Sequence, residues 1–224
     1  MQIRILSMTA QNGGSEVLLR VELCEDVFDV AENALSLARK PTRETRELVL
    51  LLDRYTELRP ARGVIDEETF LALERAAEFS EAVRIGLRML AFGSNTRRGL
   101  ENKLCRKGVA HEAAQEASLY LAQRGYIDEE RDAVREAERN VAKLRGRNRI
   151  RATLYEKGYC DAAVATAERY LDGVDFVVLC KRLIARRYEK VLDDPSEYKR
   201  VAAALMRNGY TMSEIRAALH NPSV

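Results

Sequence analysis

The apolar residues of this chain follow two periods, one near its start and another through the rest. Residues 2–9 and 16–23 are short runs rich in Ile, Leu and Val with partial alternation, which predicts β-strands. Between them lies Gln11-Asn12-Gly13-Gly14, and Asn-Gly favours a hairpin because both residues tolerate positive φ. We therefore expect an antiparallel hairpin, which must pack on other elements because a lone hairpin is only marginally stable.

Beyond the hairpin the period changes to that of a helix. First, a turn at Glu25-Asp26 would leave residues 27–30 as a third strand. The helical period begins at residue 31, where apolar residues at 34, 35 and 38 predict a helix that ends before Pro41. Thr42 is a suitable N-cap for a second helix that ends near Pro60. The apolar residues spaced along this second helix are Leu48, Leu51, Leu52 and Tyr55.

One six-residue phrase occurs three times in the remainder, as Leu104–Val109, Leu154–Tyr159 and Leu205–Tyr210. The copies are spaced 50 and 51 residues apart, and each leucine follows another apolar residue by four positions. This pattern predicts a helix with a buried i, i+4 pair, ended by a glycine in the left-handed conformation. We expect positive φ at the three glycines, Gly108, Gly158 and Gly209.

A further helix follows each glycine, and capping patterns mark where helices begin. Thr211-Met212-Ser213-Glu214 is a capping box, and Asp194-Pro195-Ser196-Glu197 and Asp128-Glu129-Glu130 are also typical helix starts. The first of these further helices should run from about Ala110 to Arg124 and stop at Gly125. Each unit is therefore expected to hold three helices, near residues 81–125, 128–172 and 175–220.

These patterns together predict a mainly α protein. We expect tandem three-helix repeats, helix-turn-helix-like in layout, in an elongated curved array that follows a small N-terminal β-hairpin and helix region. The expected division is residues 1–62 for the N-terminal region, 63–127 for the first unit with its leading acidic helix, 128–173 for the second and 174–224 for the third.

Composition supports a helical protein that does not cross a membrane. Charged residues make up 32% and there are only four prolines, which disfavours a many-stranded sandwich. No apolar run approaches the roughly 20 residues of a membrane span, and the first residues do not resemble a secretory signal. We expect a cytoplasmic protein with free, buried or half-buried thiols at Cys24, Cys105, Cys160 and Cys180.

Charge is divided unevenly along the chain. Residues 1–81 hold 10 basic and 16 acidic side chains, whereas residues 82–224 hold 27 and 19. The basic part contains three clusters of cations, one in each repeat. Each cluster is either a solvated helix surface or a face that binds a polyanion, and the recurrence of the clusters favours binding. The clusters are Arg97, Arg98, Lys103, Arg106 and Lys107; Lys143, Arg145, Arg147, Arg149 and Arg151; and Lys181, Arg182, Arg186, Arg187 and Lys190.

The cluster from Lys143 to Arg151 is the most concentrated of the three. Changing Arg147, Arg149 and Arg151 together to alanine should weaken binding to a polyanion and flatten its salt dependence. Tyrosines could add stacking on bases, but we expect them in the core or half-buried, since two of them follow the glycines of the repeated phrase. These tyrosines are Tyr120, Tyr126, Tyr155, Tyr159 and Tyr210.

Catalytic and metal-binding motifs give no support for an enzyme. His111-Glu112 begins like a zinc-protease motif, but Gln115 stands where the second histidine is required. Phosphate-binding and nucleophile-elbow motifs do not occur, and the acidic pairs are better explained as helix caps. We expect no catalytic residue, no metal and no cofactor.

Several phrases resemble the RecX family of regulatory proteins over residues 63–220. The basic segment from Arg97-Arg98-Gly99-Leu100 to Leu104–Val109 is similar to that family's basic helix and glycine stop. Gly125-Tyr126-Ile127-Asp128-Glu129-Glu130-Arg131 resembles its link between the first two units, and residues 205–219 resemble its third unit. Gly63-Val64-Ile65-Asp66-Glu67-Glu68 looks like the acidic helix start that precedes unit one.

This resemblance implies a non-enzymatic modulator of the RecA recombinase. It implies binding to RecA–single-stranded DNA filaments and inhibition of ATP hydrolysis and strand exchange. The basic clusters add the expectation of direct contact with single-stranded and also double-stranded DNA, and we expect a monomer. The alternative is a stand-alone nucleic-acid-binding protein of tandem helix-turn-helix units, with a transcriptional role. Three units in series without a dimerisation segment disfavour a dimer that reads a palindrome.

Overall fold

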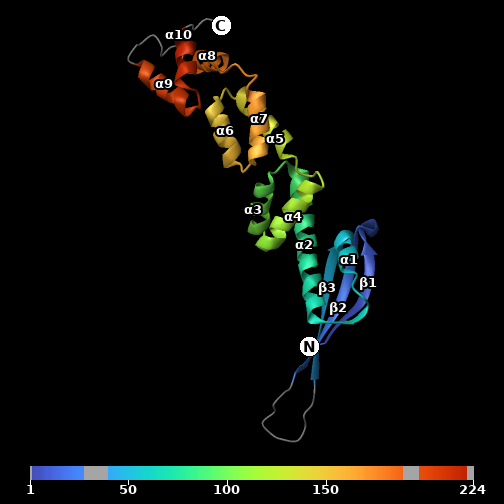
Figure 1. Ribbon diagram of the computed structural model, residues 1–224. Coiled ribbons are helices and arrows are strands. Elements are labelled where there is room, and N and C mark those ends of the chain that lie inside the picture. Colours follow the sequence, from blue (N-terminus) through green and yellow to red (C-terminus); the bar gives the residue numbers. More distant parts are fainter. Residues whose placement is uncertain (1, 28–39, 189–196, 221–224) are drawn as a thin grey trace, which may run out of the picture. The chain divides into compact units, whose positions relative to one another are not determined.

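The computed structural model describes residues 2–27, 40–188 and 197–220. In these ranges the chain is mainly helical, with a small antiparallel sheet near the N-terminus (Figure 1). The fold class predicted from the sequence is therefore confirmed. The chain forms two compact units, residues 1–89 with 101–121 and residues 90–100 with 122–224.

The sheet in the first unit has four strands in the order β3-β2-β1-β4. β1 (Gln2–Gln11) and β2 (Glu16–Val27) form the predicted hairpin, β3 (Lys40–Leu51) pairs with β2, and β4 (Gly63–Ile65) pairs with β1. The hairpin turn is a short 3₁₀ segment, Asn12–Gly14, with positive φ at all three residues. Asn and Gly accept this conformation most readily, so the local signal was sufficient to predict the turn.

The helix predicted from Thr42 is wrong over residues 42–51, which form β3. These residues pair one by one with β2, from Leu51 opposite Glu16 to Thr42 opposite Glu25. Leu48 and Leu50 alternate onto the buried face of the sheet, and the backbone partners supplied by β2 outweigh the helical spacing of the leucines. Only the last part of the prediction is helical, as α1 (Leu52–Leu58).

The predicted turn at Glu25-Asp26 is also wrong, because both residues lie within β2 opposite Thr42 and Pro41. Pro41 lies in an edge strand, where a proline costs the sheet least. The predicted third strand at 27–30 falls outside the described residues except for Val27, which belongs to β2. The helix predicted between residues 31 and 40 lies outside them except for Lys40, the first residue of β3.

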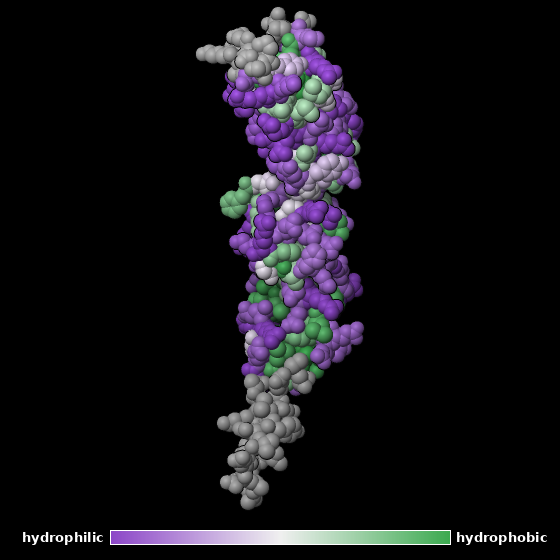
Figure 2. All heavy atoms as spheres, turned by 90° about the vertical axis from the view of Figure 1, so that its left-hand side faces the viewer, coloured by the Kyte–Doolittle hydropathy of each residue, from purple (hydrophilic) through white to green (hydrophobic). Residues whose placement is uncertain are grey.

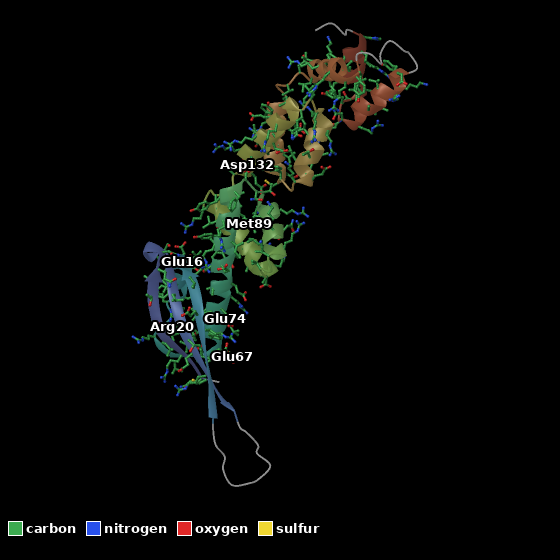
Figure 3. The ribbon with its side chains drawn as sticks, turned by 180° about the vertical axis from the view of Figure 1, so that it is seen from behind. Glu16, Arg20, Glu67, Glu74, Met89 and Asp132 are labelled. Atoms are coloured by element: carbon green, nitrogen blue, oxygen red, sulfur yellow. The ribbon has the colours of Figure 1, made fainter. Side chains whose placement is uncertain are left out.

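The long helix α2 (Glu67–Phe92) covers the buried face of the sheet. Phe70, Leu73 and Ala76 of α2 belong to one core cluster with the inward residues of β1, β2 and β3. The Asp66 carboxylate accepts a hydrogen bond from the Thr69 backbone at 2.7 Å and caps this helix. Glu74, labelled on α2 in Figure 3, pairs with Arg46 of β3 at 2.8 Å.

A buried hydroxyl connects α2 to the end of β3. The Ser80 side chain is fully buried; its Oγ accepts from the Leu51 backbone N–H at 2.9 Å and donates to the Ala76 carbonyl at 2.7 Å. The Leu51 backbone N–H, at the point where β3 ends and α1 begins, therefore has the hydrogen-bond acceptor that a buried N–H group needs.

The rest of the described chain consists of helices that follow the predicted repeats (Figure 1). In the second unit, α5–α7 and α8–α10 form two successive three-helix repeats that share one continuous apolar core. The bounds are α3 (Arg97–Arg106), α4 (His111–Gln123), α5 (Glu129–Ala142), α6 (Arg147–Glu156), α7 (Asp161–Leu171), α8 (Phe176–Arg187), α9 (Tyr198–Arg207) and α10 (Met212–His220).

The three predicted glycine stops are confirmed. Gly108, Gly158 and Gly209 have φ of 86°, 79° and 95°. In each case the backbone N–H of the residue after the glycine donates to the carbonyl of the leucine that opens the phrase, at 3.2 Å. This is the hydrogen bond of a Schellman motif, and it turns the residue after the glycine back towards the helix that has just ended.

The predicted helix starts are present where the structure describes them. Thr211 and Glu214 bond reciprocally as a capping box, at 2.7 and 3.3 Å. The Asp128 carboxylate accepts from the Arg131 backbone at 3.0 Å. The predicted start at Asp194-Pro195-Ser196 lies outside the described residues.

Within the second unit, the glycine stop of the last repeat is held by the segment that leads into α6. The Gly146 N–H donates to the Asn208 carbonyl at 2.9 Å, and the Asn148 N–H donates to the Gly209 carbonyl at 3.2 Å. The Tyr210 hydroxyl donates to the Leu144 carbonyl at 2.9 Å. We call this set of contacts the repeat joint.

The same kind of joint forms one repeat earlier. The Thr96 hydroxyl, just before α3, donates to the Lys157 carbonyl at 3.1 Å. The Glu129 carboxylate accepts from the backbone N–H groups of Arg97 and Cys160, at 2.7 and 2.9 Å. In both joints, the segment before the second helix of one repeat contacts the glycine stop of the next.

We expect Gly146→Ala to destabilise the protein by roughly 3 kcal/mol or more. Gly146 has an ordinary extended backbone (φ −73°), but an added Cβ would lie 2.2 Å from the carbonyl carbon of Gly209. Gly108→Ala is the matched control, because its positive φ has a cost of about 1 kcal/mol while its Cβ meets nothing within 4 Å. Urea unfolding measures both, and an equal loss of stability would refute the close contact.

Candidate functional site

The cations on and after α3 point away from the helix's buried side. Leu100 and Leu104 are fully buried, and the cations of the α3 cluster occupy the other faces of the helix and the turn that follows. Arg97, Arg98, Arg106 and Lys107 are exposed and form no ion pair with a described residue. Lys103 is also exposed. The α3 cluster therefore presents four guanidinium or ammonium groups that the described chain does not neutralise.

Arg147 of the second cluster has a different environment. Its guanidinium donates to the Leu171 carbonyl and to the Asp172 carboxylate, both at 2.8 Å, and approaches Glu168 at 3.4 Å. It also lies over the ring of Phe176, 5.4 Å from the centroid. Arg147 therefore ties α6 to the C-terminal end of α7, where a cation stabilises the unpaired carbonyls.

The neighbouring cations of this cluster are also mostly paired. Arg149 bonds to Glu156 at 3.2 Å, and Arg145 donates to Asn140 at 2.8 Å. Arg151 approaches Glu168 at 3.9 Å and keeps 59% of its side chain exposed. Lys143 is exposed. In this cluster, which has the highest density of cations in the sequence, the fold thus neutralises Arg147 and Arg149, while Arg145 bonds to a neutral amide.

The α5 helix contributes a buried carboxylate to the same repeat. Glu136 is buried; burial alone would raise its pKa, but hydrogen bonds from Lys157 and Asn140 outweigh burial and lower it. Lys157, at 2.7 Å from Glu136, belongs to the repeated glycine phrase. This ion pair holds the end of α6 against α5.

The third cluster lies on α8. The helix buries Phe176, Leu179, Cys180, Leu183 and Ile184 on one side, and Arg182, Arg186 and Arg187 are exposed without an ion pair to a described residue. Lys181 is half-buried, and Lys190 lies outside the described residues. Burial raises the pKa of the Cys180 thiol to about 12, so this thiol stays neutral.

Sequence reasoning missed the exposed cations of α9. Lys199 and Arg207 are exposed, and Arg200 pairs with Glu197 at 3.1 Å. Arg207 occupies the same position in the third copy of the repeated phrase as Arg106 does in the first. Aligning the three copies residue by residue was therefore the signal that could have found it.

Two of the five tyrosines correct the expectation that all are buried or half-buried. Tyr210 is buried, and Tyr159 is half-buried, with its pKa raised to about 12 by burial. The Tyr120 hydroxyl donates to Asp53 at 3.0 Å. By contrast, Tyr126 and Tyr155 are 58% and 46% exposed, because each lies outside the core position that follows the repeated glycine.

The structure also places the four thiols and His111. Cys160 is exposed, contrary to expectation, because it stands at the start of α7; the other three thiols are buried or half-buried. His111 lies 3.7 Å from Glu101 and 3.8 Å from Cys105, beside a pocket of about 360 Å³ between α2 and α4. Among the described residues, no group of three His, Cys, Asp or Glu side chains is placed to hold a metal ion.

The face of the molecule turned towards the viewer in Figure 2 is mostly polar, with hydrophobic side chains in small patches. Within residues 2–27, 40–188 and 197–220, every helix is too short or too polar to span a bilayer. The fold and these surfaces define a repeat protein of three-helix units with exposed cations.

Comparison with known proteins identifies the family. Regulatory protein RecX of Halorhodospira halophila is 32% identical over 148 residues, which cover 65% of this chain and 91% of that protein. Regulatory protein RecX of Xanthomonas axonopodis pv. citri is 30% identical over 150 residues, covering 66% and 92%. No family model matches the chain. At this identity and coverage, the chain belongs to the RecX family of regulatory proteins.

Solved structures agree on the fold. The crystal structure of a regulatory protein RecX superposes with a TM-score of 0.71 at 17% identity and covers 98% of this chain and 100% of its own. RecX from Lactobacillus salivarius gives a TM-score of 0.59 at 18% identity, covering 66% and 97%. The family resemblance predicted from the sequence is confirmed.

We expect Arg147→Ala to lower the free energy of unfolding by about 2 kcal/mol, because it removes charge-assisted hydrogen bonds to Asp172 and the Leu171 carbonyl. Arg149→Ala on the same helix removes one exposed ion pair and should cost less than about 0.5 kcal/mol. Urea unfolding distinguishes the two variants. Equal effects would show that Arg147 does not hold α6 to α7.

Proposed function

We propose that this chain is a non-enzymatic regulator that binds RecA–single-stranded DNA filaments and inhibits ATP hydrolysis and strand exchange. Its membership of the RecX family is the observation that carries the proposal. We further propose that basic helix faces contact DNA directly, and that the protein acts as a cytoplasmic monomer on single-stranded and also double-stranded DNA.

Exposed charge supports the DNA contact. Cations that the fold does not neutralise can bind phosphates and release the counterions that surround a nucleic acid. Among the described residues, four cations of the α3 cluster and three of α8 are exposed and form no ion pair. All three predicted clusters remain in the proposal, and we rank the cluster from Lys143 to Arg151 below the other two, since Arg147 and Arg149 are engaged within the chain.

The repeat layout supports the use of several faces at once. The proposed division into residues 1–62, 63–127, 128–173 and 174–224 assigns one basic cluster to each of the three helical segments. A regulator with several separated phosphate-binding faces suits a filament that presents the same backbone repeatedly. The proposal therefore assigns binding to the repeats and no catalytic step to any residue.

The alternative is a stand-alone nucleic-acid-binding protein. A short glycine-bearing turn joins the second and third helices of each repeat, as in helix-turn-helix modules. Such a protein would bind one duplex sequence in preference to a scramble of it, and would not need a recombinase. A filament regulator would not discriminate in this way.

We expect this protein to inhibit single-stranded-DNA-dependent ATP hydrolysis by the RecA of its own organism, at well below one molecule per RecA protomer. The physical reason is that one regulator bound to a filament lowers ATP hydrolysis by more RecA protomers than the one it contacts. A coupled ATPase assay measures the titration, with RecA-independent hydrolysis as the control. Full ATPase activity at equimolar protein, together with sequence-selective duplex binding, would overturn the proposal in favour of the alternative.

A further inference from the structure

The outward face of α6 carries an aromatic ring beside a cation. Tyr155 is 46% exposed, and the Arg151 guanidinium carbon, one helical turn earlier, lies 6.0 Å from the centre of its ring. The Gly158 N–H donates to the Tyr155 carbonyl at 2.9 Å. The ring is thus attached to the last turn of a helix whose backbone is held by the glycine stop and the repeat joint.

The charges around this ring leave Arg151 as its main cationic neighbour. Glu156 is paired with Arg149 and Lys157 with Glu136, at 3.2 and 2.7 Å. The Arg151 contact with Glu168, at 3.9 Å, is at the outer limit of an ion pair. Outward from the end of α6, the described chain therefore offers an aromatic face and the weakly paired Arg151 guanidinium, with the exposed Arg98 side chain against Gly158.

The corresponding position is outward in the next repeat as well. Met206 follows the buried Leu205 as Tyr155 follows the buried Leu154, and it is 51% exposed. Arg207, beside it, is exposed. Met206 thus repeats the exposed, polarizable side chain, but the cation beside it differs, since Arg207 stands at the position of Glu156 and Ala202 at that of Arg151.

We propose that Tyr155 stacks on an unpaired base of single-stranded DNA, with Arg151 beside the ring. The inference rests on the proposed function, in that it assumes contact between the repeats and DNA. An exposed aromatic ring can stack on any base that is not already stacked in a duplex, and a neighbouring arginine adds cation–π attraction and a phosphate contact. The surface therefore selects single-stranded over double-stranded DNA without reading sequence.

The absence of tryptophan from the chain makes a direct test available. Tyr155→Trp introduces a single tryptophan at the proposed stacking position, and its fluorescence can be excited separately from that of the tyrosines. Leu119→Trp on α4 is the matched control, since Leu119 is 47% exposed. We expect an oligothymidylate to quench the fluorescence of Tyr155→Trp several-fold more than that of Leu119→Trp, and a duplex of equal length to quench neither strongly.

Binding measured by anisotropy of a labelled oligothymidylate completes the test. Tyr155→Ala should weaken binding on the order of tenfold with the salt slope unchanged, because no cation is lost, whereas Tyr155→Phe should bind as the original protein does. Unchanged affinity of Tyr155→Ala, or binding without quenching of Tyr155→Trp, would overturn the inference. So would quenching by RecA alone, which would assign the ring to a protein surface.

The ATPase titration separates this inference from the proposed function. If Tyr155→Ala inhibits RecA normally and binds oligothymidylate normally, the stacking surface is refuted while the filament regulator stands. If the original protein neither binds oligothymidylate nor inhibits RecA, the proposed function fails and the stacking inference fails with it.

Discussion

The repeat joint is the contact on which the helical part of this protein depends. In each joint, the segment before the second helix of one repeat donates hydrogen bonds to backbone carbonyls at the glycine stop of the next repeat. The acceptors are the carbonyls of Asn208 and Gly209 in one joint and of Lys157 in the other. The contact between Gly146 and Gly209 leaves no room for a Cβ on either residue. Close backbone approach therefore requires glycine at 209, whereas at 108 and 158 the positive φ of the helix stop explains the glycine that recurs about every 50 residues.

The joint also determines which cations remain available. The segment into α6 must lie against the next repeat, and Arg147, the first residue of that helix, is turned towards α7 and Phe176. The Arg147 charge is therefore used in contacts within the chain. Most cations of α3 and α8 lie on faces opposite buried apolar residues and are exposed, while Lys181 is half-buried. The density of cations in the sequence is therefore a poor guide to the charge that a partner encounters.

Local signals made much of the fold predictable. The Asn-Gly turn, the three glycine stops and the capping box at Thr211 each depend on residues within a few positions of one another, and all were predicted correctly. β3 was mistaken for a helix because its conformation depends on pairing with β2 across a long connection. The leucines from 48 to 52 are compatible with either period, and only the partner strand decides between them.

The candidate site was predictable in composition but not in detail. The sequence identified the three basic clusters, yet the partners of Arg147 lie 21 to 25 residues away along the chain, on a different helix. The exposure of Tyr155 was likewise not predictable from the sequence, because it depends on which side of α6 packs against the core. Spacing along one helix indicates which residues share a face, whereas the packing of its neighbours decides which face is buried.

The salt dependence of binding to single-stranded DNA tests the central claim most directly, namely that Arg106 and Lys107 of the α3 cluster form no ion pair with a described residue while Arg147 and Arg149 of α6 are paired within the chain. Arg106→Gln with Lys107→Gln should reduce the slope of log K against log salt by about 1.4, since each phosphate contact on a single strand contributes about 0.7. Arg149→Gln with Arg151→Gln should reduce it less. Arg135→Gln with Arg139→Gln on α5, which removes the same charge from cations that pair with Asp132 and Glu136, should leave it unchanged. Equal slopes for the original protein and the α3 variant, or a larger loss from the α6 variant, would contradict the account.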